Sequence, residues 1–208
     1  MMMATSFPLD DDGVWCEVLR PCAGELRPAL FVDRDGTLIE LVPYLSDPTD
    51  VRLIAAALAL VRAANRFELP VVVITNQSGI ARGLYGWAEF AAVQARLLTE
   101  LAAAGCTIDA VMACPAGPDS DAPCRKPNPG MFTLAAARLP INLARSWIVG
   151  DSVIDLEAGR RAGLGRGWLA PTGYGPLERD AAAALAGTAF DVTLLRPIDE
   201  LAGELAAD

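Results

Sequence analysis

From residue 29 onward, short runs rich in β-branched residues alternate with longer runs rich in alanine and leucine. The sequence predicts strands at 29–32, 70–74, 108–113, 146–149, 165–170 and 190–194, and helices at 51–66, 87–104, 130–139, 154–162, 177–186 and 198–206. Alternating strands and helices form a parallel sheet with helices on both faces. We therefore expect an α/β fold with a doubly wound, Rossmann-like parallel sheet.

The segment before the first of these strands lacks the alternation. Residues 1–28 are irregular, apart from 14–19, whose pattern fits a short edge strand. A chain of 208 residues suits one domain with a large core. We expect an N-terminal arm over 1–28, packed on a single domain that runs from 29 to 208.

Charge and composition argue against several classes of protein. A net charge of −9 argues against a nucleic-acid-binding surface, which is usually basic. No apolar run approaches the roughly 20 residues of a membrane span, and the acidic N-terminal region does not resemble a signal peptide. The five cysteines are odd in number and irregularly spaced, which favours a reduced, cytoplasmic protein. The chain has no histidine, so catalysis and metal binding through imidazole are excluded.

Two aspartates follow the strand predicted at 29–32. Asp33 and Asp35 are one residue apart, so in an extended segment their side chains project to the same side. Ligands of open α/β sheets bind at the carboxyl ends of the strands. Two neighbouring carboxylates resist ionising together unless a cation lies between them. The pair therefore indicates either a metal site or an acid/base pair; an EF-hand calcium loop is excluded because its twelfth position would be Tyr44.

Polar groups also follow three other predicted strands. Thr75 and Asn76 lead into a glycine-containing turn whose donors can bind phosphate oxygens. Lys126, the one lysine among 17 basic residues, is followed by prolines at 127 and 129, which place it just before a predicted helix whose N-cap we expect at residue 128. Asp151 ends the strand at 146–149, and Asp155 follows one helical turn later. Each segment alone is a weak signal, and an ordinary turn or a solvated side chain would explain each one.

In this order, the four segments resemble the four motifs of the haloacid dehalogenase (HAD) superfamily of phosphohydrolases, over roughly residues 29–170. The segments DRDGT at 33–37, TNQSGIARG at 75–83 and CRKPNPGM at 124–131 resemble most closely the branch that contains heptose-bisphosphate and histidinol-phosphate phosphatases. The resemblance implies a Mg²⁺-dependent phosphomonoester hydrolase. Its partner would be a small phosphorylated metabolite, such as a sugar phosphate or bisphosphate.

The resemblance also implies a role for each motif residue. Asp33 would be the nucleophile that forms an aspartyl-phosphate, and Asp35 would be the general acid and base. Asp33, the backbone carbonyl of Asp35, and Asp151 would hold Mg²⁺. Thr75 would bind the phosphoryl oxygens, and Lys126 would neutralise developing charge and orient Asp33.

Other residues receive supporting roles by the same resemblance. Asn76 would bind the phosphoryl group beside Thr75, and Asp155 would support the metal shell without ligating the ion directly. Positive charge is needed near an anionic substrate in an acidic protein, so Arg34, Arg82 and Arg125 are candidates for substrate contacts.

The chain departs from this branch at two places. Members often carry a zinc loop with four Cys and His ligands, whereas Cys114 and Cys124 alone remain here, with Ala116 and Ala122 in place of two ligands. Two thiols do not make a closed tetrahedral site, so we expect no bound zinc. Ser152 stands where the branch often has a lysine, which puts the heptose-bisphosphate assignment in doubt.

Access to the site is expected to depend on loops. The spacings between the motifs leave room for about one strand–helix unit each, so no large cap domain is predicted. Residues 40–49, 77–86 and 115–125 would form the entrance. Tyr44, Tyr85 and Trp87 are candidates to line it, although packing in the core or simple exposure is the better explanation for each. A phosphotransferase or mutase, and a non-catalytic phosphate-binding protein, remain alternatives on the same fold.

Overall fold

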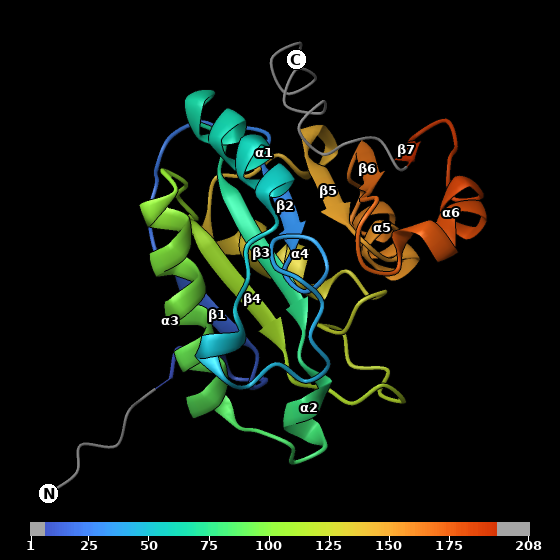
Figure 1. Ribbon diagram of the computed structural model, residues 1–208. Helices are drawn as coiled ribbons and strands as arrows, with labels where there is room; N and C mark the ends of the chain where they lie inside the picture. The colour runs from blue at the N-terminus through green and yellow to red at the C-terminus, as the bar shows by residue number, and fades with distance from the viewer. Residues whose placement is uncertain (1–6, 195–208) are drawn as a thin grey trace, which may run out of the picture.

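The computed structural model describes residues 7–194, which form one seven-stranded sheet with helices on both faces (Figure 1). The strand order is β1-β4-β3-β2-β5-β6-β7. β1 pairs antiparallel with β4, and all other neighbouring strands are parallel. The strands are β1 (Trp15–Val18), β2 (Leu30–Asp33), β3 (Val71–Asn76), β4 (Ala110–Cys114), β5 (Trp147–Gly150), β6 (Arg166–Leu169) and β7 (Asp191–Leu194).

The helices are divided between the two faces of the sheet. α1 (Ala55–Arg66) and α3 (Trp87–Ala103) pack on one face, whereas α4 (Gly130–Arg138), α5 (Val153–Arg161) and α6 (Gly175–Ala183) pack on the other. The short helix α2 (Ser78–Ala81) follows β3, and the 3₁₀ turns η1 (Pro48–Asp50) and η2 (Leu143–Arg145) lie in loops. The predicted doubly wound parallel sheet is therefore confirmed.

The central strand β2 is buried on both faces, which is why it is continuously apolar before its final residue. Leu30 and Val32 pack against α1 and α3, and Phe31 lies against Phe132 of α4 with ring centroids 4.8 Å apart. In the parallel register, Asp33 lies beside Ile74 of β3. Asp33 therefore lies at the same end of the sheet as the carboxyl ends of β3 and β5.

The edge strand expected at 14–19 is confirmed by β1, which covers the outer edge of β4. Its Trp15 is buried and packs on two aromatic rings of α3, with centroids 5.5 Å from Trp87 and 5.0 Å from Phe90. These contacts fix the N-terminal segment against the helix that faces β3 and β4.

Some predicted boundaries and features were wrong. The helix expected over 51–66 begins only at Ala55, because 51–54 form an extended segment in which Leu53 bridges to Ile39. The sequence did not predict α2. Asn128 does not cap α4: its amide donates instead to the Ala122 carbonyl at 3.1 Å, and the capping position is Pro129. The helix predicted at 198–206 lies outside the described residues.

Between the strands of residues 7–194 the chain forms the helices named above and loops, of which 34–54 and 115–129 are the longest. No separate cap domain is inserted in that part of the chain, in agreement with the expected architecture. In the same range, no helix has both the length and the apolar character that crossing a bilayer would require.

Candidate active site

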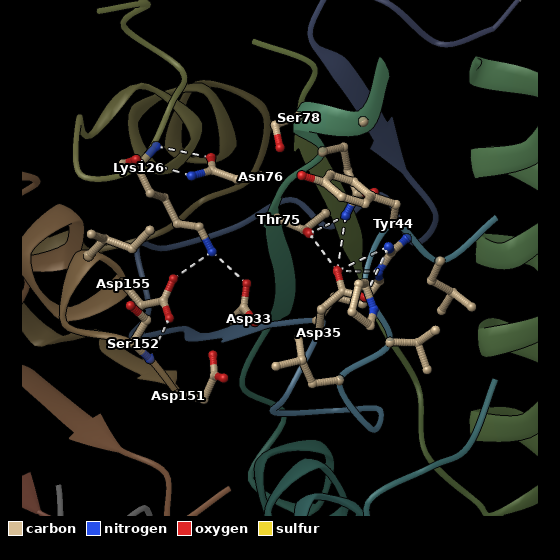
Figure 2. A pocket seen from close by; sticks show the side chains of 18 of the residues that line it. Asp33, Asp35, Tyr44, Thr75, Asn76, Ser78, Lys126, Asp151, Ser152 and Asp155 are labelled. Carbon is tan, nitrogen blue, oxygen red and sulfur yellow. Dashed lines mark hydrogen bonds and ion pairs between the residues drawn. The ribbon is translucent and has the colours of Figure 1, made fainter. Parts of the chain in front are cut away.

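A cavity of about 390 Å³ opens where β2, β3 and β5 end. Its floor contains Asp33 from β2, Thr75 from β3 and Asp151 directly after β5, and loop residues 41–45 form part of its wall. Figure 2 shows Asp33 and Asp155, from two different segments, pointing towards the ammonium group of Lys126, with Asp151 nearby. The structure thus brings together the four motifs that the sequence places at separate strand ends.

Lys126 lies between two carboxylates at the bottom of the cavity. Its Nζ is 2.5 Å from Asp33 Oδ1 and 2.6 Å from Asp155 Oδ1, and it donates to the Ile74 carbonyl at 3.2 Å. The side chain is only 2% exposed. Burial lowers the pKa of Lys126, but Asp155 and Asp33 outweigh burial, so its pKa lies above the ordinary value. Lys126 is therefore a fixed positive charge beside Asp33.

The backbone of Lys126 is held by Asn76. The Asn76 amide donates from Nδ2 to the Lys126 carbonyl at 3.0 Å, and its Oδ1 accepts from the Lys126 amide at 3.1 Å. Asn76 also lines the cavity. The side chain expected to bind phosphate thus ties the end of β3 to the loop before α4, and so positions the lysine.

Asp151 is enclosed by two glycines that leave no space for a side chain. Both Gly36 and Gly173 have positive φ, and a Cβ at either position would overlap Asp151 Oδ2. That oxygen also accepts a hydrogen bond from the Tyr174 amide at 2.9 Å. Thr172 closes the same side by donating to the Gly36 carbonyl at 2.6 Å. The Asp151 carboxylate therefore has little freedom to move.

Asp33, Asp151 and Asp155 form a buried acidic cluster, each offering an oxygen within 4.8 Å of the others. Burial raises the pKa of Asp33 well above its ordinary value, and Asp155 and Asp151 add to this while Lys126 opposes it. Burial, followed by the Asp155 carboxylate, raises the pKa of Asp151 to about 7. One ammonium does not balance three carboxylates, so the cluster favours an additional cation.

This cluster fits Mg²⁺. The ion prefers oxygen ligands and is commonly held by one or two carboxylates, with water and substrate phosphate completing its shell. Asp33 and Asp151 are the carboxylates expected to bind it. Asp155 is already engaged, because Oδ1 faces Lys126 and Oδ2 accepts from the Ser152 amide at 3.1 Å. A supporting position for Asp155 agrees with these contacts.

Asp35 faces away from the acidic cluster, towards Thr75 (Figure 2). Its carboxylate accepts from Arg34 Nε at 3.0 Å, from Gln77 Nε2 at 3.0 Å and from Thr75 Oγ1 at 3.3 Å. Arg34, expected to contact substrate, is 1% exposed and stacks over the Phe90 ring at 5.3 Å. Arg34 thus lines the cavity with its guanidinium bound to Asp35, and its contact with substrate stays a prediction.

The two other arginines differ in position. Arg125 lines the cavity and donates to the Ala116 carbonyl at 3.0 Å, so it lies at the rim next to Lys126. Arg82 is exposed and does not line the cavity; it donates to the Tyr44 hydroxyl at 2.6 Å and stacks on that ring at 5.5 Å. Tyr44 does line the cavity, whereas Trp87 packs on Trp15.

Two departures from the family pattern have structural counterparts. Ser152 caps α5 and donates from Oγ to Glu178 of α6 at 2.8 Å, so a polar contact with a neighbouring helix occupies this position. Cys114 and Cys124 lie at the two ends of the 115–123 loop with their sulfur atoms 2.6 Å apart. The hydrogen bond between the two thiols lowers the pKa of Cys114.

Sequence reasoning missed the roles of Gln77, Tyr85 and Glu178. Gln77 lies in the polar run after β3, so the sequence placed it near the site but did not indicate that its side chain points towards Asp35. Tyr85 reaches Gln77 only because α2 reverses the chain between them. Glu178 lies on a helix that the sequence placed correctly, but nothing in the sequence indicated its contact with Ser152.

Comparison with known proteins adds to this geometry. The HAD-hydrolase-like family model matches residues 123–190. The chain is 45% identical to a D-glycero-beta-D-manno-heptose-1,7-bisphosphate 7-phosphatase of Mesorhizobium japonicum, over 98% of this chain and 93% of the relative. It is 37% identical to a phosphatase of the same name from Bordetella bronchiseptica, over 70% of this chain and 82% of the relative.

Solved structures agree with the sequence matches. A HAD-like phosphatase from Mesorhizobium loti aligns with a TM-score of 0.84 and 44% identity, covering 97% of this chain and 96% of that one. A heptose 1,7-bisphosphate phosphatase from B. bronchiseptica, crystallised with magnesium and phosphate, aligns with a TM-score of 0.74 and 33% identity, covering 87% and 99%. Both similarities extend over nearly the whole of the compared chains.

Proposed function

Because the chain belongs to the HAD family of phosphatases, in the branch of the heptose-bisphosphate phosphatases, we propose that it removes the 7-phosphate from a D-glycero-D-manno-heptose 1,7-bisphosphate. The enzyme is a magnesium-dependent phosphomonoester hydrolase that acts on a small phosphorylated sugar. The identity of the sugar and the roles of individual residues form the proposal. The observation that supports these roles best is Lys126, held between Asp33 and Asp155 at the end of the central strand.

In the proposed first step, a carboxylate oxygen of Asp33 attacks the phosphorus atom and the bond to the sugar oxygen breaks. Asp35 gives its proton to that oxygen, which leaves as an alcohol, and Asp33 carries the phosphoryl group. In the second step, water attacks the same phosphorus atom and loses a proton to Asp35. The bond to Asp33 breaks, inorganic phosphate is released, and both aspartates return to their starting states.

The charges around Asp33 suit this sequence of steps. Lys126 is buried and remains charged, so it stabilises negative charge on the transferring group without reorganisation. Thr75 lies on the cavity floor, and we propose that its hydroxyl turns from Asp35 to donate to a phosphoryl oxygen when substrate binds, with Asn76 holding the lysine in position. Mg²⁺ bound by Asp33, the Asp35 backbone and Asp151 would reduce the repulsion between nucleophile and phosphate.

The second phosphate of the substrate needs positive charge at the rim. Arg125 is the nearest candidate, since it follows Cys124, lines the cavity and directly precedes Lys126. Arg82 lies behind Tyr44 and is proposed to act only through that ring. Position 152 is serine where the branch often has lysine, but the positive charge of Arg125 is unaffected because Arg125 lies on a different loop. With five thiols in the reduced state, we place the enzyme in the cytoplasm.

The test is phosphate release from heptose 1,7-bisphosphate, with ³¹P NMR to identify the ester that is cleaved. The wild type should require Mg²⁺, lose activity in EDTA, and release the 7-phosphate faster than it hydrolyses histidinol phosphate. Asp33→Asn should abolish turnover, whereas Asp180→Asn, which changes an exposed carboxylate of α6, should not.

Four outcomes would contradict the proposal. Turnover by Asp33→Asn would exclude Asp33 as nucleophile. Preference for histidinol phosphate would reassign the substrate. Phosphate that moves to an added sugar faster than to water would identify a phosphotransferase or mutase, and phosphate binding without any turnover would indicate a non-catalytic protein.

A further inference from the structure

Asp35 is held by a set of donors on the side of the cavity opposite to the acidic cluster. Oδ2 accepts from Arg34 Nε, Gln77 Nε2 and Thr75 Oγ1, whereas the contact of Oδ1 is with Arg34 Nη2 at 3.2 Å. Three donors on one oxygen fix the plane of the carboxylate. Oδ1 is consequently the oxygen that remains able to exchange a proton with a bound ester or water.

Gln77 is suited to this task because its amide is itself fixed at both ends. It is 3% exposed, and Nε2 donates to Asp35 at 3.0 Å and to Thr75 Oγ1 at 2.7 Å. Its Oε1 accepts from the Tyr85 hydroxyl at 2.5 Å. A donor on Oε1 keeps the NH₂ group turned towards Asp35, so Tyr85 sets the direction of the amide.

Tyr85 in turn has a defined place. Its ring packs directly on Gly79, where a Cβ would overlap the ring, and both residues line the cavity. Burial raises the pKa of Tyr85 to about 12, so its hydroxyl keeps the proton that it donates. On the other side of Asp35, Arg34 is fixed by its stacking on Phe90.

We propose that Gln77 and Tyr85 are positioning residues for the proton-transfer step: they hold the Asp35 carboxylate in the orientation that protonates the leaving sugar oxygen. The inference rests on the proposed role of Asp35. Neither side chain needs to touch the reacting atoms. Tyr85 acts through Gln77, and Gln77 acts through Asp35.

Leaving groups that differ in their need for a proton test the inference. An alkyl phosphate such as the heptose bisphosphate needs its leaving oxygen protonated, whereas the phenolate of p-nitrophenyl phosphate leaves without a proton. The ratio of kcat/KM for the two esters therefore reports on the acid, because kcat/KM covers the steps up to phosphoryl transfer to Asp33. A purely structural defect would lower both values together and leave the ratio unchanged.

We expect Tyr85→Phe to lower the alkyl-to-aryl ratio by about tenfold and Gln77→Leu by about tenfold to a hundredfold, since general acid catalysis contributes roughly 10²- to 10⁴-fold in total. Asp35→Asn removes the proposed acid itself and should therefore give the largest fall in the alkyl-to-aryl ratio. Gln94→Leu is the matched control, because Gln94 is equally buried, in α3, and both polar atoms of its amide lack a hydrogen-bond partner. Its ratio should equal that of the wild type.

The outcomes separate the inference from the proposal beneath it. If Asp35→Asn lowers both esters equally, Asp35 is not the acid and the proposed mechanism fails. If Asp35→Asn lowers the ratio but Tyr85→Phe and Gln77→Leu leave it unchanged, only the positioning role is overturned. Thermal unfolding of each variant identifies a folding defect, and Tyr85→Phe, which removes one oxygen atom, is the mildest of these changes.

Discussion

Replacing Lys126 by methionine tests the charge arrangement at the centre of the site. Methionine keeps much of the length of the side chain but removes the ammonium that contacts Asp33 and Asp155. Two carboxylates, 8% and 2% exposed as side chains, are then left in the protein interior without their counter-charge. The folded state should be destabilised, and the loss should be greatest in metal-free buffer, where no other cation can replace the lysine.

The magnitude follows from the burial of the pair. Removing one partner of a buried ion pair typically costs about 3–5 kcal/mol, because the remaining charge is not solvated. For a domain of about 200 residues, each kcal/mol lowers Tm by roughly 2–4 °C. We therefore expect Lys126→Met to unfold about 6–20 °C below the wild type in EDTA. Added Mg²⁺ should narrow the gap, since an ion bound only by the folded state stabilises it.

The assay is thermal unfolding followed by circular dichroism, with and without Mg²⁺. Arg125→Met is the matched control: it removes a neighbouring positive charge that is only partly buried, and should lower Tm by no more than about 4 °C, corresponding to roughly 1 kcal/mol. If the Tm of Lys126→Met in metal-free buffer lies within about 4 °C of the wild type, the reasoning is refuted. It would mean that the carboxylates are either protonated or solvated in the absence of the lysine.

Three further changes probe other parts of the structure. Gly173→Ala should weaken Mg²⁺ binding by about 10- to 100-fold in calorimetric titration, because its Cβ would displace Asp151; Gly163→Ala, with a similar positive φ but open space, should not, and equal affinities would contradict this account. Burial raises the pKa of Asp109, so the folded protein binds that proton more tightly than the unfolded chain and loses stability as the pH rises above about 4. The difference in unfolding free energy between Asp109→Asn and the wild type should therefore shift in favour of the variant as the pH is raised from 4 to 7 in urea unfolding. A difference that does not change with pH would show that Asp109 is not the group responsible. Trp15→Ala should cost about 3–5 kcal/mol in the same measurement, and a loss below about 1 kcal/mol would show that β1 contributes little to the core.

The fold and the acidic end of the site were predictable because both depend on short-range patterns. Buried parallel strands are continuously apolar, so their ends were visible wherever a polar residue followed them, as at Asp33, Thr75 and Asp151. The start of α1 was not predictable in this way. The run 51–54 is apolar in either conformation, and its extended form depends on the pairing of Leu53 with Ile39.

The directions of the side chains could not be predicted from the sequence. Arg34 lies between two catalytic candidates, yet its guanidinium turns inwards because the Phe90 ring offers it a face to stack on. Gln77 and Tyr85 meet only because an unpredicted turn of helix separates them. Asn76 was correctly placed in the cavity, but its partner is the backbone of a loop 50 residues away.

The position of Lys126 also has a consequence for how the protein acquires activity. Its ammonium contacts Asp33, 93 positions earlier in the chain, and its second partner, Asp155, lies on a third segment. Contacts of such sequence separation cannot form within a local hairpin or helix, and the chain entropy lost in closing these loops slows their formation. The proposed catalytic centre is therefore complete only after β2, the loop before α4 and α5 have docked. Recovery of phosphatase activity during refolding thus reports assembly of the whole sheet, whereas helical circular dichroism reports its parts.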